Sequence, residues 1–254
     1  MALRRAVVEA RNEALSRLIA AAVPEVLQEY ERLLTLSWIH HDCGLEGLVV
    51  TIQELQAALD ESRVSDVSLL PANRDLQAHH HAIQLVRDLA TKKRTPVTVE
   101  TIRRLFCTLT PEEPDPKVVK YREEMPLHRL YFHEISPAKK IPERMDKLVE
   151  WIADPATRAS LHPIKLAAKA HLKLLQVYPF TKNSGKLARL LMNLLLLRSD
   201  FHPAIIHSTE RHSYYEALRG SSVALTNIVT EAASNSIESA IRFFEDHAQA
   251  SATA

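Results

Sequence analysis

Apolar residues recur at helical spacing along most of the chain, and this pattern predicts an all-α protein. Leu15, Leu18 and Ile19 show the spacing near the amino terminus, and Thr51 with Glu54 has the sequence of a capping box, which starts a helix. The predicted helices cover residues 3–20, 25–36, 52–60, 73–91, 98–106, 142–153, 161–176, 185–199, 209–219 and 222–247.

Two segments depart from this amphipathic pattern. Residues 117–140 carry β-branched and aromatic residues with poor helical spacing, which predicts a short β-hairpin. Residues 185–199 are apolar around most of the helix circumference, which predicts a buried central helix. We therefore expect one helical domain with a hairpin inserted near its middle and a tail of small residues at 248–254.

Composition and charge exclude several classes of protein. The chain has 254 residues, and 32 basic against 31 acidic side chains leave a net charge of +1, so a general electrostatic attraction to nucleic acid or membrane is not expected. With only four glycines, neither a GxGxxG loop nor a GxxxxGK[ST] loop is present. A Rossmann nucleotide-binding unit and a P-loop are thereby excluded at the level of motifs.

The sequence gives no sign of secretion or membrane insertion. Cys43 and Cys107 are too few for a disulfide framework and are expected to be buried thiols in a reducing compartment. Glu9 and Arg11 interrupt the region where a signal peptide would be apolar. The longest apolar run, residues 190–197, is far shorter than the roughly 20 residues of a membrane span. We expect a soluble, cytoplasmic protein.

Two histidine-rich segments resemble metal sites only superficially. Residues 79–81 are three consecutive histidines, and residues 40–43 read His-His-Asp-Cys. Neighbours on a helix point in different directions, so consecutive histidines do not converge on one ion. We expect no metal here, but a polar helix face and a polar turn. Tyr214 near Arg211 fits either inward packing or an anion contact, and packing is the simpler interpretation.

The loop at 177–184 is the strongest candidate for chemistry. The buried helix begins directly after it, and the backbone N–H groups at a helix start form an anion site by geometry. Lys182 and Lys186 add positive charge beside that site. The pattern favours a bound phosphate or carboxylate. The alternative is an ordinary turn between two helices with solvated lysines.

These residues resemble the Fic family, whose members mostly transfer AMP from ATP to protein hydroxyls and share the motif His-Pro-Phe-x-Asp/Glu-Gly-Asn-Gly-Arg-x-x-Arg. The corresponding residues, 178–189, read Tyr-Pro-Phe-Thr-Lys-Asn-Ser-Gly-Lys-Leu-Ala-Arg. The resemblance spans roughly residues 25–245, and its other matching segments are 45–54, 120–122, 141–151, 188–198, 202–206 and 211–218. It implies one Fic fold over residues 1–254, with an inhibitory-like part at about 1–60 and a core at about 70–247.

The departures from the family motif fall on its chemistry. The family's histidine is the general base, and its place is taken by Tyr178, whose phenol has an ordinary pKa near 10. The family's Asp/Glu holds Mg²⁺ on the nucleotide, and Lys182 in its place has no lone pair for a metal. Mg²⁺ is therefore not expected, whereas ATP or another nucleotide stays open as a ligand. A nearby Lys182 is one route to a lower pKa for Tyr178.

The phosphate-binding positions are only partly kept. Asn183 and Ser184 replace Gly-Asn, and Lys186 replaces the first arginine, which keeps the charge but loses the bidentate fork. Gly185 and the second arginine, Arg189, remain. By resemblance, the anion- or nucleotide-binding residues would be Thr181, Asn183, Ser184, Gly185, Lys186, Arg189 and Tyr214.

The resemblance also assigns an inhibitory helix and a target-binding flap. In autoinhibited members, a Ser/Thr-x-x-x-Glu-Gly helix aims its glutamate at the second motif arginine. Glu46 and Gly47 match, and Asp42 stands where the family has Ser/Thr. An ion pair between Glu46 and Arg189 is therefore expected. The flap that docks the target chain would include Leu127, Arg129, Tyr131 and Ile135.

Three hypotheses are compatible with these residues. The favoured one is a pseudoenzyme that lacks AMP transfer and binds an unidentified protein partner, with a nucleotide or another anion as a further ligand of its loop. The second is a transferase of altered chemistry or substrate that uses Tyr178 and Lys182. The third is a structural protein, such as a homodimer, whose loop is empty.

Overall fold

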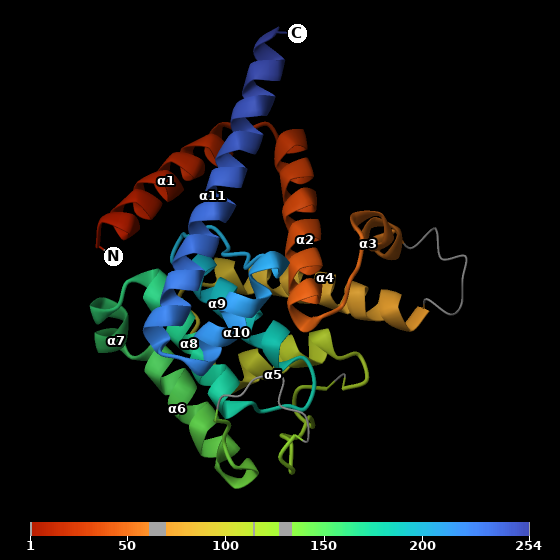
Figure 1. Cartoon of the computed structure of the whole chain (residues 1–254), viewed down its shortest axis with the longest axis vertical. Coiled ribbons are helices and arrows are strands. Elements are labelled where there is room, and N and C mark those ends of the chain that lie inside the picture. Colours follow the sequence, from red (N-terminus) through yellow and green to blue (C-terminus); the bar gives the residue numbers. More distant parts are fainter. Residues whose placement is uncertain (1, 61–69, 114, 127–133, 254) are drawn as a thin grey trace.

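A computed structural model describes residues 2–60, 70–113, 115–126 and 134–253 of the chain, and these residues fold into helices and connecting loops (Figure 1). The all-α prediction is confirmed. The helices are α1 (Ala2–Ala21), α2 (Pro24–Glu46), α3 (Ile52–Leu59), α4 (Leu70–Thr91), α5 (Val99–Leu109), η3 (Ala138–Lys140), α6 (Ile141–Ala153), α7 (Pro155–Ser160), α8 (Pro163–Val177), α9 (Ser184–Arg198), η4 (Ser208–Glu210), α10 (Arg211–Arg219) and α11 (Ser222–Thr253).

Helix α9 is the centre of the fold, as its apolar circumference predicts. It lies amid the other helices in Figure 1 and packs against α8, α4 and α5. Leu187, Leu190, Leu191 and Leu194 have no solvent exposure. Because α9 is covered on nearly all sides, the polar groups that it carries must find partners inside the protein.

Helix α2 is longer than the sequence pattern predicts. It continues past residue 36 to Glu46 and ends at Gly47, whose φ of 88° requires the left-handed conformation that glycine adopts readily. The polar turn expected at residues 40–43 is therefore wrong. Trp38, Ile39 and Leu45 are buried on this added part of the helix, so its apolar face holds the polar residues between them in helical conformation.

The predicted β-hairpin is not present in the described residues of 117–140. Residues 118–122, expected in its first strand, lie outside any strand. Most of the expected second strand falls on residues 127–133, so Leu127, Arg129 and Tyr131 lie outside the described residues. Ile135 is described and is 7% exposed, which places it in the interior rather than on an open flap.

Two further helical segments differ from the prediction. Helix α7 is a six-residue helix that the apolar spacing did not reveal, and Asp154 caps it by accepting hydrogen bonds from the backbone N–H groups of Ala156 and Thr157. Helix α11 continues through the expected tail to Thr253. Its last turns extend beyond the other helices in Figure 1, and its earlier part packs against α1.

Among the residues that the structure describes, no helix has the length and apolar content needed to cross a membrane.

Asn193 offers a test of how the central helix is anchored. It is buried, and its side-chain amide exchanges two hydrogen bonds with the peptide groups of Ala204, at 2.9 Å and 3.3 Å. We predict that Asn193→Ala lowers the free energy of unfolding by about 2–4 kcal/mol, because a buried donor and a buried acceptor lose their partner. Urea denaturation measures the change. Gln28→Ala, at an exposed position on α2, is the control, and an equal effect of the two substitutions would contradict the prediction.

Candidate active site

The motif loop between α8 and α9 is fixed by bonds to the backbone. Tyr178 ends α8 in the left-handed region (φ 49°, ψ 63°), which turns the chain away from the helix axis. The Arg122 guanidinium donates to the carbonyl of Tyr178 at 2.7 Å and to the carbonyls of Glu124 and Ser136. The backbone N–H of Arg122 donates to the Pro179 carbonyl. Arg122 thus ties the loop to segments that precede α6.

The two residues that depart from the family's Gly-Asn pair bond within the protein. Asn183 adopts the left-handed conformation (φ 56°) and donates its side-chain amide to the Leu109 carbonyl and the Thr110 hydroxyl, both at 3.0 Å. The Ser184 hydroxyl donates to the Phe180 carbonyl at 2.8 Å. Their side chains therefore stabilise the loop, and these groups are not directed to a ligand.

Lys182 does not provide a metal site. Thr181 and Lys182 are exposed at the tip of the loop, and Lys186 is half-buried on the first turn of α9. An ammonium donates hydrogen bonds only and has no lone pair for a cation. Throughout the described part of the chain, no group of three or more His, Cys, Asp or Glu side chains is arranged to hold a metal. The residues present do not fit the Mg²⁺ that the family resemblance implies.

The Tyr178 phenol is a poor proton acceptor in this setting. Burial raises its pKa above the ordinary value of 10, and the Glu46 carboxylate raises it further, while Arg122 and Ser184 oppose the shift. Lys182 is not among the groups that shift this pKa; the nearby cation that lowers it is Arg122, and burial outweighs its effect. At neutral pH the phenol keeps its proton and does not act as a general base.

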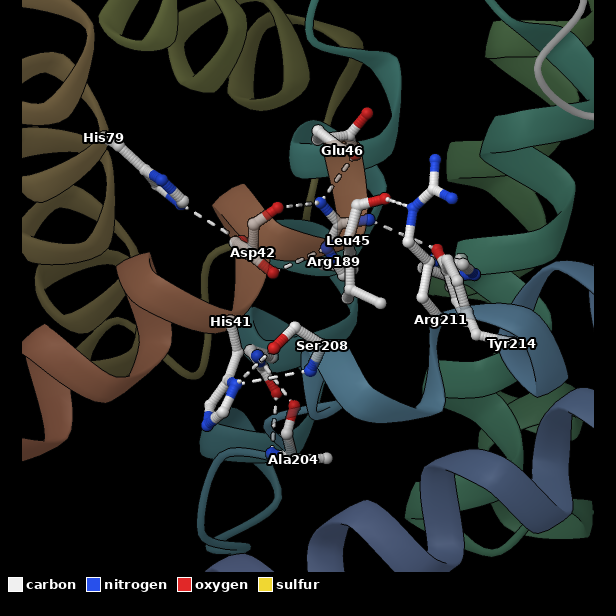
Figure 2. A network of polar contacts seen from close by, with 12 residues as sticks. His41, Asp42, Leu45, Glu46, His79, Arg189, Ala204, Ser208, Arg211 and Tyr214 are labelled. Atoms are coloured by element: carbon white, nitrogen blue, oxygen red, sulfur yellow. Dashed lines mark hydrogen bonds and ion pairs between the residues drawn. The ribbon is translucent and has the colours of Figure 1, made fainter. Parts of the chain in front are cut away.

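Arg189 lies at the centre of a buried polar network (Figure 2). The residue is 1% exposed. Its Nε donates to Asp42 Oδ1 at 2.6 Å, and its Nη2 donates to Glu46 Oε1 at 2.7 Å. Its Nη1 donates to the Tyr214 hydroxyl at 3.3 Å. The expected ion pair with Glu46 is present, and sequence reasoning missed the second carboxylate, Asp42.

Asp42 contacts a histidine as well as the arginine. Nε2 of His79 lies 3.1 Å from Asp42 Oδ2, and both side chains are buried. Burial alone would raise the pKa of Asp42, but the attraction of Arg189 and the contact with His79 outweigh it and bring this pKa to about 2. Burial lowers the pKa of His79, so its imidazole is neutral. The prediction that residues 79–81 form a polar helix face is therefore wrong for His79.

A carboxylate of the chain itself lies at the start of α9, where the sequence predicts an anion. A Cβ atom placed on Gly185 would lie 2.2 Å from Oε1 of Glu46, so this carboxylate rests against the first turn of α9. Only glycine leaves room for it there. Glu46 is 24% exposed at its side chain, whereas Asp42 is 5% exposed. The site thus has an inner carboxylate and an outer one.

Helix α10 holds the end of α2 in place. The Leu45 carbonyl accepts hydrogen bonds from Nε of Arg211 at 2.9 Å and from the Tyr215 hydroxyl at 2.6 Å. Tyr214 is buried, and its hydroxyl pairs with Nε2 of His171 at 2.9 Å. The inward packing predicted for Tyr214 is correct. The contact with Arg189 shows that Tyr214 also belongs to the site.

The packing of α2 against η4 adds a second constraint. Gly44 lies so close to Ser208 that a Cβ atom on the glycine would be 2.5 Å from the Ser208 Cβ. Beside it, the rings of His41 and His207 stack with centroids 4.2 Å apart. The backbone N–H of Ser208 donates to Nδ1 of His41 at 3.2 Å. Any side chain at position 44 would therefore push α2 and η4 apart.

Sequence comparison places this site in a known family. A sequence model of the Fic/DOC family matches residues 76–196, which include the motif loop, most of α9 and Arg189. This part of the chain is similar to the Fic/DOC family, so the predicted resemblance to that family is confirmed. Asp42 and Glu46 come from α2, which lies outside the matched residues.

Two curated relatives of the chain are distant in sequence. The chain is 27% identical over 183 residues to the protein adenylyltransferase Fic of Nematostella vectensis, and it is 26% identical over 182 residues to protein adenylyltransferase fic-1 of Caenorhabditis elegans. Each match covers 71% of this chain but only 42% and 35% of the respective relatives.

Solved Fic structures share the whole fold. A Fic-domain signalling protein from Bacteroides thetaiotaomicron superposes with a TM-score of 0.82 at 22% identity, covering 96% of this chain and 98% of the other. Fic-1 from C. elegans gives a TM-score of 0.78 at 23% identity, covering 96% of this chain and 75% of the other. These likenesses establish the Fic fold for the chain.

The two carboxylates on Arg189 are predicted to differ in their contribution to stability. We expect Asp42→Asn to lower the free energy of unfolding by about 3–5 kcal/mol, because the buried Arg189 cation loses its buried carboxylate partner. Glu46→Gln removes the more exposed partner, and we expect a loss of about 1–3 kcal/mol. Chemical denaturation measures both. Glu143→Gln, in an exposed pair with Lys147, is the control. A smaller loss for Asp42 than for Glu46 would contradict this ranking.

The low pKa of Asp42 also predicts how stability depends on pH. Because this pKa is about 2 in the folded protein and 3.8 as a model value, the contribution of Asp42 is complete above about pH 4 and declines as the pH falls towards 2. The thermal midpoint of the wild type should fall more steeply between pH 4 and 2 than that of Asp42→Asn. Parallel curves for the two proteins would show that Asp42 is not the titrating group.

Proposed function

We propose that this chain is a Fic-domain protein without AMP-transfer activity, which acts by binding a protein partner. The observation that carries the proposal is the pairing of Arg189 with both Asp42 and Glu46. By resemblance, this arginine is the second motif arginine and would contact nucleotide phosphates. A guanidinium already neutralised by two carboxylates offers little attraction to a further anion.

The base and metal positions support the same proposal. Transfer to a hydroxyl needs a group that takes its proton, and loss of a general base alone typically costs about 10²–10⁴ in rate. Tyr178 has a raised pKa, which makes this role still less favourable. Lys182 gives no ligand to a phosphate-bound metal, whose charge stabilisation is worth several kcal/mol. The transferase hypothesis would have to compensate for all of these losses together.

Because the fold is kept while the catalytic groups are replaced, a binding role is the function that we infer for this chain. Curated relatives are named protein adenylyltransferases, so the chemistry of the family resemblance concerns protein substrates. We infer that this chain keeps the protein-binding part of that activity. Cys43 and Cys107 are free and buried, which fits a partner in the reducing cytoplasm. Because the chain spans less than half of these relatives, the partner and the complete activity belong to the proposal.

Incubation with labelled ATP and Mg²⁺ tests the proposal. We predict no labelling of the protein itself or of lysate proteins, and no labelling after Tyr178→His or Glu46→Gly alone. The reason is that groups acting as a unit are strongly non-additive, so single repairs recover little. A band that Tyr178→Phe abolishes would support the transferase hypothesis and overturn the proposal. Robust activity of Tyr178→His would show that neither Lys182 nor Asp42 is an obstacle.

A combined reversal to the family motif provides the positive arm. The set is Tyr178→His, Lys182→Asp, Asn183→Gly, Ser184→Asn, Lys186→Arg and Glu46→Gly. We expect Mg²⁺-dependent self-labelling only when Asp42→Ser is added to this set, because Asp42 otherwise still holds Arg189. Equal activity with and without Asp42→Ser would contradict the role assigned to Asp42. Thermal melts confirm that both proteins fold.

A further inference from the structure

A groove between α4 and α5 lies outside the motif loop and is lined by none of its residues. Its volume is about 700 Å³, within the range of binding pockets. Arg74 and His81 line it from α4, and Arg104 lines it from α5. Among its described lining residues there is no Asp or Glu. In a chain with a net charge of only +1, this is a local concentration of positive charge.

The two arginines of this α4–α5 groove have no carboxylate partner among the residues that the structure describes. Both side chains are exposed, and over the described ranges neither guanidinium takes part in an ion pair. Arg32 and Arg242, by contrast, each pair with a glutamate one turn away on their own helix. A guanidinium binds a carboxylate through two parallel hydrogen bonds, which makes Arg74 and Arg104 suited to acidic side chains.

Apart from Gln77 and Thr108, the remaining lining residues of the α4–α5 groove are apolar. Ala78, Cys107, Pro111 and Pro116 contribute to it beside the charged residues. Proline and alanine surfaces accept apolar side chains without leaving buried polar groups unpaired. A ligand that combines carboxylates with apolar groups therefore matches the groove better than a simple anion does.

The charge is also distributed along the α4–α5 groove. Glu112, Glu113 and Asp115 follow the carboxyl end of α5 in the sequence, so negative charge gathers there. The positive side chains stand on the two helices themselves. A bound segment should therefore place its acidic residues against Arg74 and Arg104 and its apolar residues towards Cys107 and the prolines.

We propose that the α4–α5 groove binds an acidic peptide segment of a protein partner, with Arg74 and Arg104 as the residues that select carboxylates. The groove is open to solvent rather than enclosed, which suits a peptide chain better than a small molecule that must be enclosed. That the occupant is a protein segment rests on the proposed function. The groove is connected to the motif loop, because Asn183 bonds to Leu109 at the end of α5.

Selection from a phage-displayed random peptide library tests this proposal. The library is panned on the whole chain, with counterselection on Arg74→Glu/Arg104→Glu, and the best peptide is then measured by fluorescence anisotropy. We expect enriched peptides to combine Asp or Glu with apolar residues. We expect the double substitution to weaken their binding by tenfold or more, since each lost charged contact is worth up to about a tenfold change.

Controls distinguish the groove from general electrostatics. Arg17→Glu, at an exposed position on α1 that does not line the groove, should leave peptide binding unchanged. Replacing Glu by Gln in the selected peptide should weaken binding to the wild type. No enriched peptide, or peptides that bind both proteins equally, would overturn the proposal. If inorganic pyrophosphate binds the groove and no peptide does, the proposal is overturned in favour of a site for small anions.

The outcome for the groove can be separated from the outcome for the proposed function. AMP transfer is read with labelled ATP, and the groove is read by peptide binding. If the chain labels proteins and still selects acidic peptides, only the proposed absence of AMP transfer is overturned. If it labels nothing and selects no peptide, only the groove proposal is overturned.

Discussion

The burial of the Arg189 guanidinium is the constraint on which this structure depends. A charge removed from water costs several kcal/mol unless it is paired and hydrogen-bonded, and α9 places this one at the middle of the fold. Both of its carboxylates come from α2, one helical turn apart. Helix α2 must therefore stay helical as far as Glu46, and α10 holds that end through the Leu45 carbonyl.

The sequence predicts well the features that depend on apolar spacing. The central helix, the loop before it and most helices follow from that spacing, and Glu46 followed from the family resemblance. Hydrophobic periodicity does not detect buried charges. In the sequence, His79 and Asp42 look like ordinary polar surface residues. Their contact becomes visible only when α2, α4 and α9 pack together in the fold. The missed end of α2 has the same cause, because tertiary packing rather than local propensity decides it.

The departures from the family motif are consistent with one another. Asn183 and Ser184 direct their side chains to groups within the protein, and the retained Gly185 leaves room for Glu46. A loop built to hold phosphates would leave such groups for the ligand. Here internal partners satisfy them, so the loop is stable without one, and local sequence and global fold agree.

Asp42 decides whether the Glu46 contact works as a switch or as a permanent bond. If Glu46 alone neutralised Arg189, movement of the Glu46 side chain into solvent would leave a free guanidinium. Glu46 is already partly exposed, so this movement would cost little free energy. Asp42 is fixed between Arg189 and the neutral His79, with almost no access to water. Moving it would leave a buried cation and a buried carboxylate unpaired, at a cost of about 3–5 kcal/mol for each broken pair. That is a large share of the stability of an ordinary domain. The inner carboxylate therefore keeps Arg189 neutralised even when the outer one moves away.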